Sequence, residues 1–600
     1  MAKSRIALFF RQSRMRRTFY IGSAITVFVI GCFAMAGQGP PPKHTTETSD
    51  KIDAADTAAC MSCHADEQEN FAAVHDKSLA ASPHKDLKCQ DCHTSMDAFP
   101  HTDEMRKDKP SCGKCHPEED DAYGQSSHSH PDKQKGDHPT CVTCHANGDP
   151  HAVRPSHRRT RAELALLCSS CHEQKERMDR YGVDSDAVAS YDESFHGKAV
   201  LKFGNLKAAI CLDCHGIHDV LPPQNPKAHT NRANAAKLCS KPSCHPGANV
   251  TFAMSGANHL RLMVKRGPVL RLVDLFFRFL TGGMILFLTG GVALDLRKKV
   301  FGKTPPRSGR IPGLLTSLSF LGMVIALGCA AFGLILQATY FFGGSVLVLA
   351  LGYLTYFATR MKPTEKSSSV GTYTRFDRIH RLQHVVLMVC FVMLIATGLP
   401  LRFAQVDLLH RPWAYVGGLE GARIIHRIGA VTLILVWFWH VIDLLWRWKR
   451  QGFQLKSLTM LPNRKDVRDF MVTSLSYVGL SNEEPRNDRF QFRQKMDYLA
   501  EYWGVPIMVL TGFVLWFPIY WGDRLPEQAV AVALVAHGWE ATLAFSAIIM
   551  WHLYNEHFNP DSFPMSKVWL TGTLTREEME REHPVELERI EAENSDEAID

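Results

Sequence analysis

Residues 60–64 read Cys-Met-Ser-Cys-His, and two cysteines separated by two residues and followed at once by a histidine recur five more times before residue 216. A seventh copy has four residues between its cysteines. The motifs are Cys60, Cys63 and His64; Cys89, Cys92 and His93; Cys112, Cys115 and His116; Cys141, Cys144 and His145; Cys168, Cys171 and His172; Cys211, Cys214 and His215; and Cys239, Cys244 and His245. In such a motif the two thiols bind the haem vinyl groups as thioethers, and the histidine ligates the iron. The repetition predicts seven covalently bound haem c groups.

Other uses of these cysteines fit the pattern less well. A zinc ribbon has no need of a histidine after every second cysteine. A disulfide framework would not repeat so regularly. The motifs take fourteen of the seventeen cysteines, and the others, Cys32, Cys329 and Cys390, lie in apolar stretches where we expect inert thiols.

The chain between the motifs is polar and holds too few apolar residues for a conventional core. We therefore expect loops and short helices, with little β-structure, wrapped around the haems. Each iron needs a second axial ligand, and a surplus of histidines favours histidine over methionine, which would raise the potentials. The candidates are His75, His84, His101, His128, His130, His138, His151, His157, His196, His218, His229 and His259. His196, in Ser194-Phe195-His196-Gly197, and His218, in His215-Gly216-Ile217-His218, resemble distal ligands of multihaem cytochromes c.

The N-terminus combines a basic segment without acidic residues and an apolar run over 19–36. This arrangement predicts a signal anchor with a cytoplasmic N-terminus. Alternatives are a signal-peptidase site at 34–36, a lipidated Cys32, and a twin-arginine signal at 16–17. The last is disfavoured because haem attachment normally follows export of an unfolded chain. Each interpretation places residues 45–262 outside the cytoplasmic membrane.

From residue 266 the composition changes to long apolar runs that suit helices crossing a bilayer. We expect spans at about 272–294, 313–336, 339–358, 384–403, 424–446, 500–520 and 531–555, eight with the anchor. The basic loops at 295–312, 359–381 and 447–495 place both termini in the cytoplasm and the cysteine-rich segment outside.

These patterns predict a mainly α-helical chain: a loop-rich multihaem segment and a transmembrane bundle that contains a four-helix di-haem unit. The expected parts are 1–40 (anchor), 41–265 (haem c), 266–362 (three spans without histidine), 363–570 (di-haem unit) and 571–600 (acidic tail). In the first of the three spans, Asp274 and Arg278 are spaced for an intrahelical pair. We expect the tail to be a solvated helix or partly disordered.

Paired histidines distinguish the last four spans. His426 and His440 are fourteen residues apart, nearly on one helix face and about 21 Å apart along the axis. His537 and His552 are similarly spaced, which predicts two b haems at different depths. His426 and His537 would share the outer haem. His384, His440 and His552 compete for the inner one, and depth alone suggests His440 with His552.

The segment from about 375 to 570 resembles the di-haem cytochrome b of the formate dehydrogenase gamma subunit and hydrogenase b-type cytochrome family. The resemblance rests on Arg381-Leu382-Gln383-His384, Thr397-Gly398, Thr511-Gly512, His426 with Gly429, Gln494-Lys495 and His552-Leu553-Tyr554. It implies that His384 pairs with His552, but Val385 replaces the usual tryptophan and His440 is additional. The inner ligand is therefore open between His384 and His440.

The same resemblance implies a quinone site near the inner haem, at Gln491, Gln494 and Lys495. The alternative is that these are ordinary residues of a cytoplasmic loop. Glu540, one turn after His537, is an intramembrane acid for proton transfer or for a local hydrogen bond.

A di-haem cytochrome b fused to an external multihaem cytochrome c resembles quinol oxidases of anaerobic respiration in the bacterial inner membrane. The resemblance implies oxidation of quinol, with menaquinol expected, and transfer of electrons to periplasmic cytochromes or reductases. Membrane or periplasmic subunits are a further class of partner to test, and nucleic acid is not expected. One alternative is an anchor that passes electrons from a periplasmic dehydrogenase or hydrogenase to quinone. Another is a terminal reductase with an open haem iron.

Overall fold

A computed structural model describes residues 57–65, 74, 76–96, 102–107, 109–129, 138–155, 158–301, 372–455, 458–477, 480–481, 483–560, 562 and 565–597. The expected N-terminal anchor and the expected spans at 313–336 and 339–358 lie outside these residues. So do His75, His101, His130 and His157. The chain divides into two compact units, Met1–Leu262 with Phe403–Gly421, and Met263–Arg402 with Ala422–Asp600.

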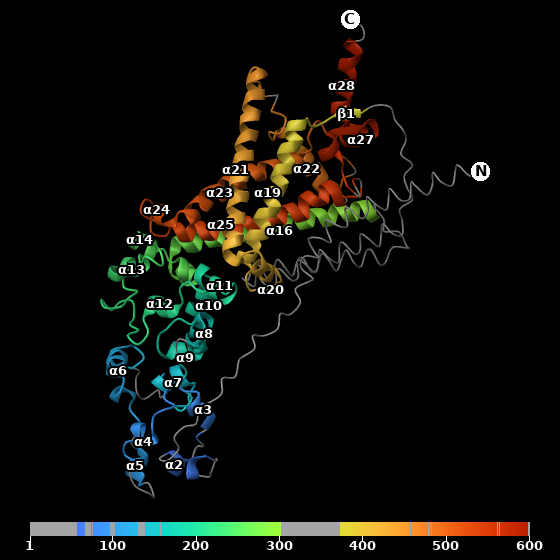
Figure 1. Cartoon of the computed structure of the whole chain (residues 1–600). Helices are drawn as coiled ribbons and strands as arrows, with labels where there is room; N and C mark the ends of the chain where they lie inside the picture. The colour runs from blue at the N-terminus through green and yellow to red at the C-terminus, as the bar shows by residue number, and fades with distance from the viewer. Residues whose placement is uncertain are drawn as a thin grey trace, which may run out of the picture. The chain divides into compact units, whose positions relative to one another are not determined.

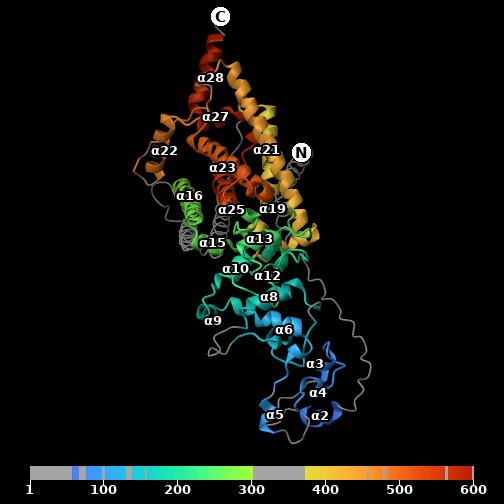
Figure 2. The same cartoon turned by 90° about the vertical axis from the view of Figure 1, so that its left-hand side faces the viewer.

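The first unit is built of short helices and loops. Its residues up to 262 are coloured blue to green in Figure 1 and are seen from another side in Figure 2. The α-helices are α2 (Thr57–His64), α3 (Asp76–Ala80), α4 (Cys89–Cys92), α5 (Asp103–Lys107), α6 (Pro117–Gly124), α7 (Cys141–Ala146), α8 (Arg161–His172), α9 (Lys175–Arg180), α10 (Asp186–Asp192), α11 (Phe195–Leu201), α12 (Cys211–His215), α13 (Arg232–Cys239) and α14 (Val250–Ala253). The unit also has 3₁₀ turns at η1 (Cys112–Lys114) and η4 (Ala257–His259), and α20 (Asp407–His410) and η5 (Arg411–Tyr415) belong to it. As expected, its described residues contain no strand.

Capping residues start several of these helices and fix the histidines on them. The Ser194 side chain accepts a hydrogen bond from the Gly197 amide and so caps α11, which carries His196. At Gly197 a Cβ atom would lie 2.0 Å from the Tyr191 carbonyl oxygen. Only glycine permits this close approach of α11 to the end of α10. The structure therefore explains the serine and the glycine of the Ser-Phe-His-Gly sequence.

The second unit holds five helices that are long and apolar enough to cross a membrane: Pro268–Leu296, Arg378–Arg402, Gly418–Arg450, Phe492–Trp516 and Ala529–Phe558. They correspond to α16 (Pro268–Phe301), α19 (Arg378–Arg402), α21 (Gly418–Arg450), α23 (Phe492–Trp516), and α25 (Ala529–Ala547) with its continuation. Shorter elements are α15 (Leu260–Arg266), α22 (Arg464–Tyr477), α24 (Pro518–Gly522) and α26 (Val568–Thr571).

The fourth of these helices differs from the expected span at 500–520. It begins at Phe492, where the Gln494 side chain returns to accept a hydrogen bond from the Gln491 amide. It ends at Trp516, two residues before Pro518 starts α24. Capping and proline, rather than hydropathy, fix both ends.

The helix without histidines, α16, lies alongside α25 (Figure 1). Leu288 and Val292 pack against Trp551 and Tyr554 in a buried apolar cluster. The expected pair within α16 is confirmed: Nε of Arg278 donates to Oδ2 of Asp274 at 2.6 Å. Trp539 of α25 donates to the other oxygen of Asp274 at 3.0 Å, so the pair also fixes one helix against the other.

The last candidate span changes its winding near the predicted inner ligand. After α25, the segments η7 (Ile548–His552) and η8 (Tyr554–Phe558) are π-helical. Wider turns of this kind are rare and often occur at functional sites. His552 closes the first of them.

The acidic tail, expected at 571–600 as a solvated helix or partly disordered segment, is largely helical over its described residues to 597, but part of it is buried rather than solvated. Strand β2 (Thr573–Thr575) pairs antiparallel with β1 (Thr372–Thr374), and α27 (Arg576–Glu582) and α28 (Pro584–Glu597) follow. Leu574, Met579 and Leu587 form a buried cluster. The acidic composition gave no sign of a buried cluster, because these apolar residues are few. The fold brings them together.

Candidate haem sites

Histidines of the cysteine motifs lie opposite other histidines throughout the first unit. Six such pairs have ring centroids 5.9–6.3 Å apart: His84–His116 (6.1 Å), His93–His151 (6.3 Å), His128–His172 (6.2 Å), His145–His218 (6.0 Å), His196–His245 (5.9 Å) and His215–His259 (6.3 Å). Each pair joins one motif histidine to one histidine outside a motif. Both expected distal ligands, His196 and His218, are among them.

This separation fits a metal held between two imidazoles. A metal–nitrogen bond of about 2 Å on each side, plus the two ring radii, places the centroids roughly 6 Å apart. Burial lowers the pKa of His215 to about 4 and lowers the pKa of His196. Burial therefore favours the neutral form of these two rings, which is the form that binds iron.

The second cysteine of each motif is predicted to form a thioether. These cysteines differ in how far their side chains are exposed to solvent. Cys115 and Cys244 are exposed, whereas Cys171 is half-buried and its Sγ atom accepts a hydrogen bond from Nη1 of Arg177 at 3.1 Å. Cys63 lies on α2, but its side chain is outside the described residues. None of these placements tests a bond to a haem vinyl group. For Cys63, Cys115, Cys171 and Cys244 the thioether therefore stays a prediction from the motif.

The stretched seventh motif adopts the same arrangement of its histidine. The His245 amide donates to the carbonyl of Cys239 at 3.1 Å, so the extra residues loop out and the histidine still faces His196. Among the described residues, the motif cysteines form no disulfide bonds.

His64 completes the set of motif histidines. The histidines outside a motif that are nearest to it in sequence include His75 and His101, which lie outside the described residues. His229 instead contacts Asp219 through Nε2 at 2.9 Å.

In the second unit, His426 of α21 faces His537 of α25 with ring centroids 6.4 Å apart. Nδ1 of His426 donates to the hydroxyl of Thr397 at 2.8 Å, and Nδ1 of His537 donates to that of Thr511 at 2.9 Å. Each threonine in turn donates to a carbonyl one turn earlier in its own helix, at Met393 or Ile507. The hydroxyls therefore fix both rings with Nε2 available for a metal.

The inner pair is His384 of α19 with His552, again with centroids 6.4 Å apart. Nδ1 of His552 lies 3.4 Å from Oδ2 of Asp497 on α23, a carboxylate that can orient the ring. The structure thus brings together the residues that the family resemblance paired.

His440 lies elsewhere, although depth alone suggested it for the inner site. Its Nδ1 lies 2.9 Å from the Gln383 side-chain oxygen, and its Nε2 lies 3.0 Å from the Tyr498 hydroxyl. Both ring nitrogens are occupied by protein groups. Spacing on one helix gives depth, but it does not say which neighbouring helix a side chain faces.

The residues expected at a quinone site are partly engaged in the protein. Lys495, 6% exposed, pairs with Asp466 of α22 at 2.9 Å. The Gln494 side chain caps α23, and the Gln491 backbone amide is its partner. The structure therefore gives the Gln494-Lys495 element a structural role at the start of this helix.

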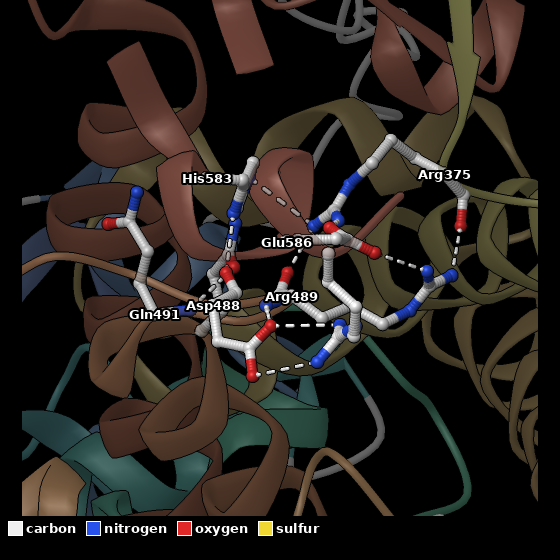
Figure 3. Close-up of polar contacts among 8 residues, drawn as sticks. Arg375, Asp488, Arg489, Gln491, His583 and Glu586 are labelled. Carbon is white, nitrogen blue, oxygen red and sulfur yellow. Dashed lines mark hydrogen bonds and ion pairs between the residues drawn. The ribbon is translucent and has the colours of Figure 1, made fainter. Parts of the chain in front are cut away.

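A buried ion-pair network holds the same helix start against the C-terminal helices (Figure 3). Glu586 pairs with Arg375 and with Arg489, the latter at 2.6 Å. Nδ1 of His583 donates to the Asp488 carbonyl at 2.8 Å, and its Nε2 lies 3.3 Å from Arg375. Burial, followed by the charge of Arg375, lowers the pKa of His583 to about 4. No sequence motif indicated this network.

The donors in the membrane unit fit two b haems, because each pair presents two imidazoles at the separation that a shared iron requires. His384 and His552 would hold the inner group, and His426 and His537 the outer one. The supporting threonines were visible in the sequence only as Thr-Gly pairs of the resemblance. No pattern in the sequence pointed to Asp497.

In the comparison with protein families, residues 375–556 match prokaryotic cytochrome b561. A search of curated proteins finds no match. The matched segment includes both histidine pairs of the second unit, and this family implies two b haems and electron transfer within the membrane. The chain is therefore a multi-pass membrane protein that carries a prokaryotic cytochrome b561 domain at its C-terminal side.

Proposed function

We propose that this protein oxidises quinol, with menaquinol as the expected substrate, and passes the electrons through two b haems and seven c haems to a periplasmic acceptor. The observation that carries the proposal is the run of histidine pairs, six in the cysteine-rich unit and two in the cytochrome b561 domain. One-electron redox chemistry would be supplied by the haems themselves.

The protein's own contribution is ligation and orientation. Two histidine ligands favour low potentials, which suit electrons from menaquinol. Thr397 and Thr511 orient the outer pair, and Asp497 lies beside the inner pair. The motif histidines of the first unit follow one another along the chain. This arrangement suits a row of closely spaced haems that carry electrons, rather than one catalytic centre.

Paired histidines also bear on the alternative of a terminal reductase. Such an enzyme needs one iron with a free axial position, and six of the seven motif histidines have an opposing histidine. Low-spin signals from all the c haems would support electron transfer. A high-spin ferric signal in the isolated protein would support the reductase.

The direction of electron flow is tested in membranes with menaquinol as reductant, with the b and c α-bands followed separately. Reduction of the b haems and then the c haems, abolished by a quinone-site inhibitor, is the expected result. Reduction of both sets and of the quinone pool by a periplasmic donor, with no response to menaquinol, would overturn the proposed direction.

A further inference from the structure

His440 is an ionisable residue on a membrane-spanning helix that the haem sites do not use. Ionisable side chains at such depth are costly to bury and usually serve a function. With Nδ1 donating to the Gln383 oxygen, Nε2 of the neutral ring is an acceptor for the Tyr498 hydroxyl, 3.0 Å away. His440 is therefore held as a base with a hydroxyl proton directed at it.

A second tyrosine extends the hydrogen bond between Tyr498 and His440 into a chain. The Tyr498 and Tyr502 hydroxyls, one turn apart on α23, are 3.1 Å apart. Because the Tyr498 proton points at His440, Tyr498 can accept a hydrogen bond from Tyr502. The result is a line of hydrogen bonds in which Tyr502 donates to Tyr498 and Tyr498 donates to His440.

The other side of His440 leads to charged groups near the expected cytoplasmic surface. The His380 ring lies 6.1 Å from the His440 ring, and Nε2 of His380 lies 3.5 Å from Asp443, one turn after His440 on α21. Arg447 pairs with Asp443 at 2.7 Å and with Asp377 at 2.7 Å. The exposed side chain of Asp377 connects this group with solvent.

The line also lies beside the inner haem site. Gln383, which holds His440, directly precedes His384 on α19. A quinol oxidised here must release two electrons and two protons. The inner histidine pair would receive the electrons, and the adjacent line offers a base for the protons.

We propose that Tyr502, Tyr498 and His440 form a proton relay that accepts the hydroxyl protons of the quinol and delivers them toward His380, Asp443 and the cytoplasmic surface. This inference rests on the proposed function. In each transfer Tyr498 gives its proton to Nε2 of His440 and takes one from Tyr502, which takes one from the quinol hydroxyl. The protonated His440 then releases a proton toward His380 and Asp443, which returns it to the neutral form for the next transfer. Quinol loses two protons and two electrons in all and becomes quinone, and a haem held by His384 and His552 would accept the electrons one at a time.

The test uses the full-length protein in membranes and compares wild type with His440→Ala and Tyr498→Phe. Both variants should keep two b haems with wild-type optical spectra, and dithionite should reduce them fully. Reduction by menaquinol should slow by about tenfold or more, as for loss of a proton-transfer group. Added imidazole should restore much of the rate in His440→Ala but not in Tyr498→Phe.

Tyr520→Phe is the matched control, because Tyr520 is exposed on α24, just beyond the other end of α23 and outside the relay. It should react like wild type. Unchanged menaquinol rates in both test variants would overturn the relay alone. Loss of one b haem in His440→Ala would overturn it by making His440 a ligand. If wild-type b haems do not respond to menaquinol, the proposed function fails.

Discussion

Thr397 accepts a hydrogen bond from Nδ1 of His426 at 2.8 Å, and this contact joins two membrane-spanning helices, α19 and α21. Thr511 and His537 repeat it between α23 and α25 at 2.9 Å. In both cases Cε1 of the histidine lies 3.5 Å from where a Cβ would lie on the glycine after the threonine, Gly398 or Gly512. The outer haem site is therefore built from two copies of one local arrangement.

Replacing Thr397 by valine should weaken the outer haem site. The His426 ring loses the acceptor that fixes its orientation, and loss of such a supporting contact typically lowers metal affinity or activity about 10- to 100-fold. The b-haem content of purified Thr397→Val, measured as the pyridine haemochrome, should fall from two toward one. Thr432→Val is a matched control, because Thr432 is an exposed threonine on α21 that bonds only a carbonyl of its own helix. Equal haem loss in both variants would show a general effect on the membrane helices.

His218 should be a haem ligand, and its replacement should affect one haem. The ring centroids of His145 and His218 lie 6.0 Å apart, so in His218→Ala the proposed c haem at His145 would lose its second axial imidazole. One of the seven c haems should become high-spin, with a higher potential, while all seven remain attached through their thioethers. Electron paramagnetic resonance and a redox titration measure both effects. His229→Ala is the control, since His229 contacts Asp219 rather than a motif histidine, and it should leave the spectrum unchanged.

Lys495 should act through Asp466 rather than on the quinone. Lys495→Met leaves the nearly buried Asp466 carboxylate without its partner, which costs about 3–5 kcal/mol when a buried pair is broken. Asp466→Asn should lower the thermal stability by a similar amount. The double variant should regain most of the loss. If Lys495→Met instead raises the quinol concentration needed for half-maximal rate at unchanged stability, the lysine contacts quinone directly.

Hydropathy was sufficient to find all five membrane helices that the structure describes, because a bilayer requires long apolar runs whatever the packing. The ends of these helices depended on local capping, as at Gln491 and Trp516, and were less well predicted. Motif spacing located every cysteine and histidine of the seven motifs in the sequence. It could not pair His145 with His218, because such partners are brought together only by the fold.

His440 illustrates the same limit within the membrane. Its spacing from His426 gave the depth of an inner ligand, but Gln383 and Tyr498 occupy its nitrogens. The acidic tail shows a different limit. Its composition predicted solvation, whereas single side chains such as His583 and Glu586, each 2% exposed, are buried in contact with basic residues far away in the sequence.

The buried His583 should make the attachment of the C-terminal helices dependent on pH. Its pKa is lowered from 6.5 to about 4 in the folded chain, where Nε2 accepts from Arg375 and Nδ1 donates to Asp488. Between these values the detached tail binds a proton that the folded tail excludes. The contribution is therefore complete above pH 6.5 and is lost as the pH falls toward 4, by on the order of 3 kcal/mol at most.

Hydrogen exchange of the α28 amides, corrected for the intrinsic effect of pH, should thus show faster opening at pH 4.5 than at pH 7. His583→Gln separates this titration from other acid effects, because a glutamine amide can still donate to the Asp488 carbonyl and accept from Arg375, yet binds no proton. The variant should keep its protection at pH 7 and lose less of it at pH 4.5 than wild type does. His583→Leu makes neither bond and should open faster at both pH values. If wild type and His583→Gln lose protection in parallel, carboxylates such as Glu586, rather than His583, control the acid response.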